Sequence, residues 1–410
     1  MTRWLSFGAT VLAALWLQSC GLHEQVMLVH NKWGFIDRAG KWIVPPRFDE
    51  IQRDYESGAS SFEPHDDESP IAVQENGKWG YIDRSGKILI KPKYWYAGKF
   101  SDGLAKVQLD EEALYIDKTG KVKFTTEKDP EKADDFQEGL APFPSADGKM
   151  GYVDVAGHFV IAPQFIDCSP FSEGLASVKV KLPSGVEETD YIDKNGIAHI
   201  RIPWKGRKEV FGNQFSDGIA IVFWSASKDD SYGYQLIDRS GKRLSVPPNC
   251  KLDDGNRIAE GMIRIQTGEK FGFMNANGQI VVPVRFTHTG SFSSGLAPAS
   301  ELNVSGSEVY GYIGKTGSWI IPPQYSAASP FENGLAAVRR VGINRYGYID
   351  ITGKEVIEPR FEELGPYRGD ISAAGIVIGE NGKDILEATE RPTIQDWVEL
   401  LFKSRAQPHR

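Results

Sequence analysis

Trp33-Gly34-Phe35-Ile36-Asp37-Arg38-Ala39-Gly40-Lys41 is the stretch that decides the fold, because the chain repeats it. Close copies stand at 79–87 and 347–354, and weaker copies lie between them. The aspartate slot of the pattern recurs about every 40 residues, at positions 37, 83, 117, 154, 193, 238, 275, 314 and 350. Such a period is typical of a repeat architecture in which each copy is one supersecondary unit. We therefore count nine copies.

Each copy predicts a hairpin from local chemistry alone. Asp at the first turn position accepts hydrogen bonds from amides two residues on, and Gly at the fourth adopts positive φ without steric cost. Asp37 to Gly40 and Asp350 to Gly353 both fit a type I turn followed by a glycine bulge. A glycine before the turn, such as Gly80, leaves room for close approach of another backbone. The strand after the turn is β-branched and ends at a proline, such as Pro45 or Pro92.

A second motif, Phe-x-x-Gly-Leu-Ala, alternates with the first. It stands at Phe100–Ala105, Phe136–Ala141, Phe171–Ala176, Phe215–Ala220, Phe292–Ala297 and Phe331–Ala336, with Ile219 in the leucine slot of the fourth. We expect it to start a third strand, so that each copy holds three. The 43 Gly, 23 Pro and 11 % aromatic residues agree with short strands and many turns.

The pattern resembles the WG-repeat family, also called KWG repeats. Lys32-Trp33-Gly34 and Lys78-Trp79-Gly80 carry the motif literally, and the resemblance runs from about residue 28 to residue 378. Copies three, five and six are degenerate. The resemblance implies a β-rich repeat domain over 28–378, often found in exported bacterial proteins, with no activity common to the family.

One unit buries too little apolar surface to fold alone, so neighbouring units must stack. We expect an all-β, open β-solenoid, because nine units exceed the usual four to eight blades of a propeller. A propeller-like ring is the alternative, since about 40 residues also suit a blade. The segment 379–410 predicts a capping helix and tail, because Ile394, Trp397, Val398 and Leu401 recur at helical spacing.

The first residues resemble a bacterial lipoprotein signal. Arg3 precedes an apolar run that is too short to span a bilayer comfortably, so 1–19 is expected to be a signal peptide. Leu17-Gln18-Ser19-Cys20 resembles a lipobox, which implies cleavage before Cys20, lipidation of its thiol and a lipid-anchored linker at 20–27. Gly21 after the cysteine favours the outer membrane if the cell is Gram-negative, facing the periplasm or the surface. Cys168 and Cys250 are interpreted as free, buried thiols, with a disulfide as the alternative.

The sequence shows no catalytic constellation. The Asp series recurs at a turn position, which makes it a poor source of a unique acid or base. No zinc spacing, serine elbow, phosphate loop or Cys-x-x-Cys is present, and Glu63–Glu68 is interpreted as a solvated acidic loop. We therefore predict no enzyme, no metal and no cofactor. The net charge of −8, with no basic stripe along the sequence, argues against nucleic acid.

The function that follows is a non-catalytic, membrane-anchored protein-binding scaffold of the bacterial envelope. One version is an immunity-type inhibitor of an envelope toxin, and the alternative is a module for peptidoglycan or surface polysaccharide. Binding in repeat arrays is expected where the copies differ. The candidate binding residues are therefore the large aromatics near breaks in the pattern, Trp95, Tyr96, Trp204 and Trp224. Ordinary local packing is the alternative for each of them.

Overall fold

The computed structural model describes residues 30–51, 69–110, 112–126, 133–203, 207–226, 232–252, 258–368 and 371–378. The chain divides into two units, of which Asn31–Ile376 is the larger. The other, Met1–His30 with Val377–Arg410, falls almost wholly outside the described residues. The predicted signal peptide, Cys20 and the C-terminal helix therefore lie outside them as well. Within the described ranges, no helix is long and apolar enough to cross a membrane.

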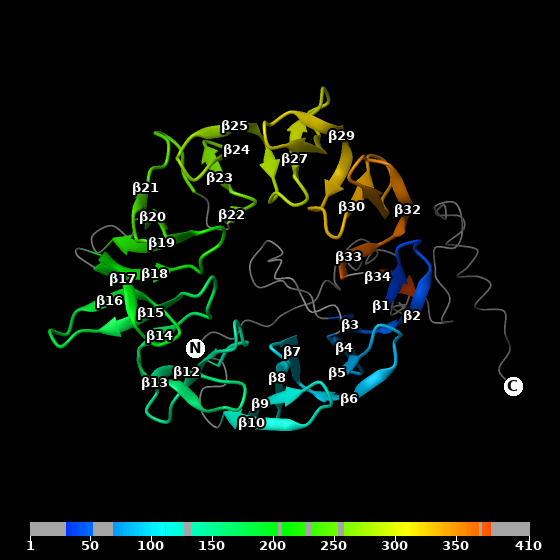
Figure 1. Cartoon of the computed structure of the whole chain (residues 1–410). Helices are drawn as coiled ribbons and strands as arrows, with labels where there is room; N and C mark the ends of the chain where they lie inside the picture. The colour runs from blue at the N-terminus through cyan, green and yellow to red at the C-terminus, as the bar shows by residue number, and fades with distance from the viewer. Residues whose placement is uncertain are drawn as a thin grey trace, which may run out of the picture. The chain divides into compact units, whose positions relative to one another are not determined.

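The described chain consists of strands joined by turns (Figure 1), as predicted for an all-β protein. The strands are β1 (His30–Asp37), β2 (Trp42–Phe48), β3 (Glu50–Ile51), β4 (Ile71–Glu75), β5 (Lys78–Ile82), β6 (Ile88–Tyr94), β7 (Tyr96–Ser101), β8 (Leu104–Leu109), β9 (Glu112–Asp117), β10 (Val122–Thr126), β11 (Ala141–Pro144), β12 (Met150–Val153), β13 (Phe159–Phe165), β14 (Asp167–Cys168), β15 (Ala176–Lys181), β16 (Glu187–Ile192), β17 (Ala198–Pro203), β18 (Arg207–Gly212), β19 (Ile219–Ala226), β20 (Tyr232–Asp238), β21 (Arg243–Leu244), β22 (Ile258–Ala259), β23 (Met262–Thr267), β24 (Lys270–Met274), β25 (Ile280–Phe286), β26 (His288–Thr289), β27 (Leu296–Leu302), β28 (Glu308–Gly314), β29 (Trp319–Ala328), β30 (Leu335–Arg340), β31 (Tyr346–Asp350), β32 (Glu355–Phe361), β33 (Glu363–Arg368) and β34 (Ile371–Ile378).

The strands form small antiparallel sheets that follow the repeat. The sheet orders are β3-β4-β5-β6, β7 to β10, β11-β12-β13, β14 to β17, β18 to β21, β22 to β25 and a longer sheet, β26 to β32, that joins two copies. Most copies therefore have four strands, and the expectation of three was wrong. The additional strand comes first in its copy and can be as short as two residues, as in β14 and β26, so it carries no alternation that a sequence pattern could reveal.

The predicted turn is confirmed in all nine copies. In each, the fourth-position glycine has positive φ, and its amide donates to the carbonyl of the first residue, as Gly40 does to Asp37 at 2.9 Å. The Asp37 carboxylate accepts the amides of Ala39 and Lys41, at 2.9 and 2.8 Å. The turn aspartate thus caps the loop, and its recurrence is explained by geometry.

The glycine of the WG dipeptide is coupled to the proline of the next strand. A Cβ at Gly80 would lie 2.5 Å from the Ile90 carbonyl oxygen and 2.6 Å from the Pro92 nitrogen. The register between β5 and β6 shifts at this point, because proline cannot donate to the ladder and the outer strand bulges towards the glycine. Copies three and five have Leu114 and Asp190 in the glycine slot, and there the outer strand pairs directly with these residues through Thr125 and Arg201, with no proline opposite the slot.

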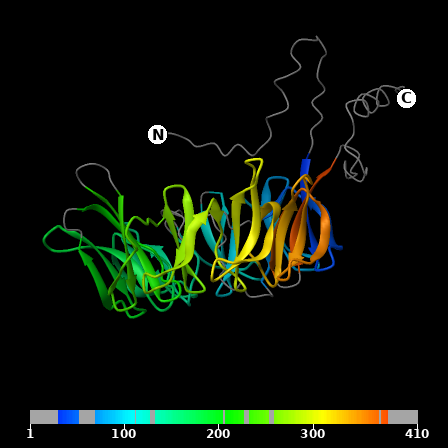
Figure 2. The same ribbon diagram turned by 90° about the horizontal axis from the view of Figure 1, so that it is seen from above.

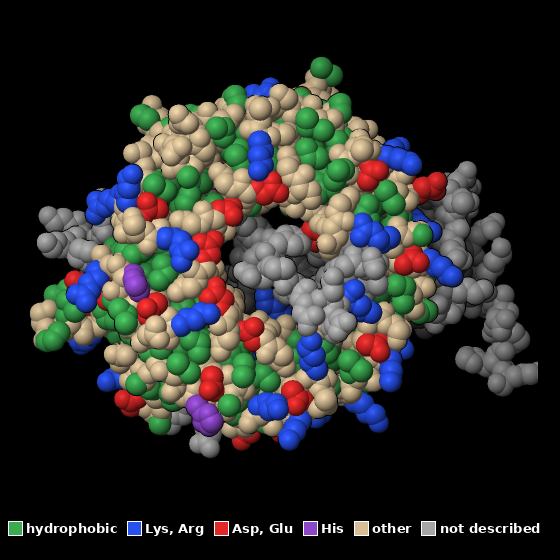
Figure 3. Space-filling view, viewed as in Figure 1, with side chains coloured by type: hydrophobic (Ala, Val, Ile, Leu, Met, Phe, Trp, Pro, Cys, Tyr) green, Lys and Arg blue, Asp and Glu red, His purple; other side chains and the backbone are tan. Residues whose placement is uncertain are grey.

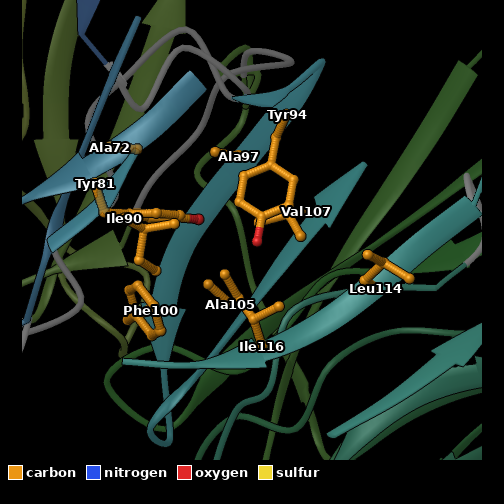
Figure 4. Packing of buried hydrophobic residues seen from close by; sticks show 10 residues of the cluster. All are labelled: Ala72, Tyr81, Ile90, Tyr94, Ala97, Phe100, Ala105, Val107, Leu114 and Ile116. Carbon is orange, nitrogen blue, oxygen red and sulfur yellow. The ribbon is translucent and has the colours of Figure 1, made fainter. Parts of the chain in front are cut away.

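The core lies between consecutive copies. Eight of nine apolar clusters combine residues of two copies that follow one another, and the ninth combines residues of the first and last copies. The cluster between copies two and three packs Tyr81, Ile90 and Tyr94 against Val107, Leu114 and Ile116 (Figure 4). All nine clusters fall within Asn31–Ile376, so this unit has a complete core of its own. The dependence of each copy on its neighbour was predicted, and these clusters show it.

The first and last copies also meet. The sheet that contains the first Asp turn has the order β2-β1-β34-β33, so strands from both ends of the repeat region share it. Ile36 packs in one cluster with Tyr348 and Ile357. In seven of the eight later copies the turn glycine lies against the outer strand of the preceding copy, and in copy seven Gly278 lies against Ser245, just after that strand. Gly40 repeats the contact with Ile357 of copy nine. The favoured expectation of an open solenoid predicts no contact of this kind.

Antiparallel pairing places the turns and links of the repeat unit at two opposite ends of its strands; Figure 2 shows the unit edge-on. The Asp-x-x-Gly and Phe-x-x-Gly turns lie at one end of the strands, which we call the Asp-turn face. The loops between second and third strands, and the links from one copy to the next, lie at the other end, which we call the link face. β1 starts at the link face, so the chain enters the repeat unit from that side.

Candidate functional site

The Asp-turn face is held by a ladder of carboxylates. In the Phe-x-x-Gly turns, and in the equivalent turn Ile258–Gly261 of copy seven, the residue before glycine has positive φ, as does the glycine, which identifies a two-residue hairpin turn of type I′. The carboxylate of this residue accepts the glycine amide of the next copy's turn. Five such bonds follow one another: Gly139 to Asp102, Gly174 to Glu138, Gly218 to Glu173, Gly261 to Asp217 and Gly295 to Glu260.

Basic residues of the neighbouring Asp turns complete this ladder. Lys194 donates to the Glu138 carbonyl at 2.8 Å and pairs with its carboxylate at 3.1 Å. Lys315 does the same to Glu260, at 3.0 and 3.1 Å. Acidic side chains accordingly gather around the centre of the view in Figure 3. Because five of these carboxylates bind backbone amides of the next copy, their recurrence has a structural cause.

The turn aspartates are held in their ionised form. Hydrogen bonds, first from the Thr119 hydroxyl, lower the pKa of Asp117 to about 2. A bond with His199, followed by backbone amides, lowers the pKa of Asp193 to about 2. A carboxylate held ionised in this way is a poor general acid or base at neutral pH. The hydrogen bonds that lower these two pKa values are those that hold the turns, so both carboxylates have a structural role.

Buried tyrosines connect neighbouring copies through hydrogen bonds, a role that the sequence analysis did not predict. The tyrosine two residues before the turn donates its hydroxyl to a backbone carbonyl of the next copy: Tyr81 to Gly98 at 2.7 Å, Tyr152 to Ser169 at 2.7 Å and Tyr312 to Ser329 at 2.8 Å. Burial raises the pKa of Tyr312 well above its ordinary value. The spacing of 17 residues between donor and acceptor recurs in these copies and was a signal that the sequence already contained.

The link face differs from copy to copy, and it carries two of the predicted aromatics. Trp95 and Tyr96 stand at the link from β6 to β7 and are 56 % and 42 % exposed. The amine of Lys78, the first residue of the KWG motif, lies 2.8 Å from the centre of the Trp95 ring. A cation over the face of an aromatic ring is attracted by its quadrupole, so Lys78 holds this exposed ring in place.

The position 17 residues after this lysine holds other residues in other copies. Lys32 pairs with Asp49 at 2.5 Å, and Lys270 donates to Thr287 at 3.1 Å, again 17 residues on. The lysine contact is thus common to three copies, while its partner changes. Further exposed apolar side chains occupy links and loops of this face: Ile166, Val186, Leu302, Val304, Val341 and Ile343. The link face therefore combines a lysine contact that recurs in three copies with loops and links whose exposed, partly apolar side chains differ from copy to copy.

The other two predicted aromatics do not join this site. Trp224, on β19, is partly buried against the cluster between copies five and six. A Cβ at Gly233 would lie 2.4 Å from its ring, so the indole packs flat over that glycine. Local packing, the alternative for this residue, accounts for its position. Trp204 lies outside the described residues, as does the acidic loop Glu63–Glu68.

Neither a metal site nor a disulfide appears among the described residues. No group of three or more His, Cys, Asp or Glu side chains in those ranges could hold an ion. Cys168 and Cys250 are free thiols and half-buried. Burial raises the pKa of the Cys168 thiol, which disfavours its reactive thiolate.

Comparison with known proteins identifies the repeat. The WG containing repeat family matches six segments: 33–62, 79–112, 150–181, 271–303, 310–340 and 346–376. The chain is a WG-repeat protein. The three degenerate copies supply none of the WG-repeat starts, which agrees with the loss of the Gly-Pro pair in copies three and five. Among curated proteins, none matches by sequence.

Solved structures resemble this WG-repeat protein in fold. A crystal structure of the eukaryotic initiation factor has a TM-score of 0.53 at 11 % identity, covering 84 % of this chain and 98 % of that one. The WD40 domain of SCAP from fission yeast covers the same shares at 10 % identity, with a TM-score of 0.31. At 11 % identity the first likeness concerns the fold alone, and the second, with its low TM-score, carries no argument.

Proposed function

We propose that this WG-repeat protein is a non-catalytic protein-binding scaffold that binds through its link face. The observation that carries the proposal is the exposed Trp95–Tyr96 pair, with Lys78 fixing the indole. Large, rigid aromatics anchor protein interfaces because they bury much apolar area at low entropic cost. The Asp-turn face is a weaker candidate, because its repeated side chains are engaged in holding neighbouring copies together.

We also propose that Asn31–Ile376 is a closed, propeller-like ring. The sheet shared by β1, β2, β33 and β34 supports closure, as does the contact of Gly40 with Ile357. In such a ring the link face is one rim on which the described links are presented together. A partner could then contact several variable tips at once, which an extended array would spread along its length.

The cellular setting is part of the same proposal. The signal-like segment 1–19 and the lipobox-like Cys20 support export and lipid anchoring in the bacterial envelope, facing the periplasm or the surface. β1 begins at the link face, so a tether at Cys20 would enter the repeat unit on that side. An immunity-type inhibitor, which holds an envelope toxin against this face, is the specific version that the anchor and the acidic charge suggest.

The test compares three versions of the chain without residues 1–20. The wild type, a Trp95→Ala/Tyr96→Ala double variant and a Phe159→Ala control are immobilised and exposed to envelope extract. Phe159 is 42 % exposed on the outer strand β13, so its loss removes a comparable aromatic from another surface. A protein retained by the wild type and the control, and lost from the double variant, is the expected result. Equal retention by all three would refute the site.

The glycan alternative rests on the same side chain, the exposed indole of Trp95. An exposed indole can stack on a sugar as well as on a protein. Sedimentation of the chain with purified sacculi separates the two, because a glycan module co-sediments without any protein partner. Co-sedimentation that Trp95→Ala abolishes would favour glycan binding over the scaffold.

A further inference from the structure

The outer edge of copies one to three gathers positive charge in an acidic protein. The segments 37–48, 83–94 and 117–126, which run from the Asp turn through the outer strand, contain ten Lys or Arg and three Asp. The six corresponding segments of the other copies contain nine Lys or Arg and six Asp or Glu between them. No basic stripe is visible along the sequence, because these residues are divided among three segments and become neighbours only through the repeat.

Contacts between copies bring the three segments side by side. Val44 of β2 lies against Gly86 in the next turn, and Ile90 of β6 lies against Gly120 in the turn after that. The Arg47 guanidinium donates to the Gly86 carbonyl at 2.9 Å, which joins the first two segments directly. Lys and Arg side chains accordingly lie along the lower margin of the unit, over β6 and β10 (Figure 3).

The exposed side chains of this edge are of two kinds. Lysines project at Lys41, Lys87, Lys91, Lys93, Lys121 and Lys123, and all six are exposed. Aliphatic side chains alternate with them at Ile43, Ile88, Leu89 and Val122, with 37–44 % of each exposed. We call these ten residues the basic edge. The turn aspartates beside it bind backbone amides, and the Asp117 carboxylate also pairs with Lys123 of the edge at 3.5 Å.

We infer that the basic edge is a contact site for a bilayer surface bearing anionic headgroups. Lysines near such a surface are attracted by its negative potential, and aliphatic side chains between them can enter the headgroup region. Nucleic acid would also attract the lysines, but it offers nothing to the exposed isoleucine and leucine side chains. The mixture of the two kinds of side chain therefore favours lipid.

The inference adds a second membrane contact to the proposed lipid anchor. Nine residues lie between Cys20 and His30, where β1 begins, and a fully extended chain from one to the other spans at most about 35 Å. β2 is the neighbour of β1 in the same sheet, so the basic edge starts beside the strand to which the tether leads. Lipid and edge together would hold the repeat unit in one orientation on the membrane.

The experiment uses a chain without residues 1–20, so that its outcome does not depend on lipidation. Flotation with vesicles of phosphatidylcholine alone is compared with vesicles containing roughly 30–40 % phosphatidylglycerol. We expect binding to the anionic vesicles only, weakening as salt rises. Lys91→Glu/Lys93→Glu should reduce the partition coefficient roughly 25-fold or more, since each lysine near an anionic surface contributes about fivefold. Leu89→Ser should reduce it several-fold at constant charge.

The matched control is Lys242→Glu/Lys251→Glu, which makes the same charge change at exposed positions of other copies. Its effect on the partition should be smaller than that of the edge variant by about tenfold or more. Equal loss in both double variants, or no binding to anionic vesicles, would overturn the inference and leave the scaffold proposal intact. Stronger binding to double-stranded DNA than to anionic vesicles would overturn it in favour of nucleic acid.

Discussion

Replacing Gly80 by alanine tests the coupling between the WG glycine and the proline strand. The new Cβ would lie 2.5 Å from the Ile90 carbonyl oxygen, 2.6 Å from the Pro92 nitrogen and 2.8 Å from the Pro92 Cα. All three atoms belong to the β6 backbone, so no side-chain rotation relieves the overlap. Restoring even a tight contact requires β6 to move by about 0.5 Å in a close-packed seam.

The magnitude follows from two opposing terms. Overpacking of this kind lowers the free energy of unfolding by about 1–3 kcal/mol. We expect Gly80→Ala to lie near the upper end of this range, because the shift of β6 also breaks hydrogen bonds between β5 and β6. The smaller backbone entropy of alanine in the unfolded chain returns about 0.4–1 kcal/mol. We therefore expect a net loss of about 2 kcal/mol in the free energy of unfolding.

The assay is urea denaturation together with amide hydrogen exchange. Gly77→Ala is the control in the same hairpin, because Gly77 has a φ of +73° and a Cβ added there would meet nothing within 4 Å. It should cost only the strain of a left-handed alanine, about 1 kcal/mol, and leave the exchange protection of β5 and β6 unchanged. A Gly80→Ala protein within about 0.5 kcal/mol of wild type, with β5 and β6 still protected, would refute the reasoning.

Three further predictions concern single side chains. Tyr312→Phe should lower the free energy of unfolding by about 1–2 kcal/mol in urea melts, because it leaves the partly buried Ser329 carbonyl without its donor; an unchanged midpoint would contradict a stabilising role for this hydrogen bond. The pKa of Asp117 is lowered to about 2, so its stabilisation is complete above the unfolded pKa of about 4 and is lost as the pH falls towards 2. Asp117→Asn should therefore flatten the urea midpoint profile over that acidic range, and an identical profile would exclude the carboxylate as its cause. Burial raises the pKa of Cys168, so iodoacetamide should modify it at neutral pH only as the protein unfolds; alkylation at the rate of a free thiol would show that it is accessible.

The hairpins were predictable because their chemistry is local. Asp37 and Gly40 determine the turn conformation within four residues, and the structure has this turn in every copy. The type I′ turns were missed for the opposite reason. Glu138 adopts a φ of +54° that nothing in its own side chain demands, and the bond that stabilises it comes from Gly174 of the next copy.

The candidate site was predictable only in part. Trp95 and Trp224 look alike in the sequence, since each is a large aromatic near a break in the pattern. Their environments differ because the Trp224 indole packs over Gly233, which has no side chain, whereas Trp95 lies exposed at a link between copies. Contacts of this kind, like those that assemble the basic edge, depend on which segments the repeat brings together.

The sheet shared by the two ends of the repeat region has a consequence for biosynthesis. The first hairpin emerges from the ribosome long before β34, its partner, and the Arg360 bond to Gly40 closes a separation of 320 residues. Until then β1 offers an unpaired strand edge to any other chain nearby. Contacts so distant in sequence also slow folding. A WG-repeat protein of this length should consequently depend on chaperones while it is being made, and more so when its last strands are truncated.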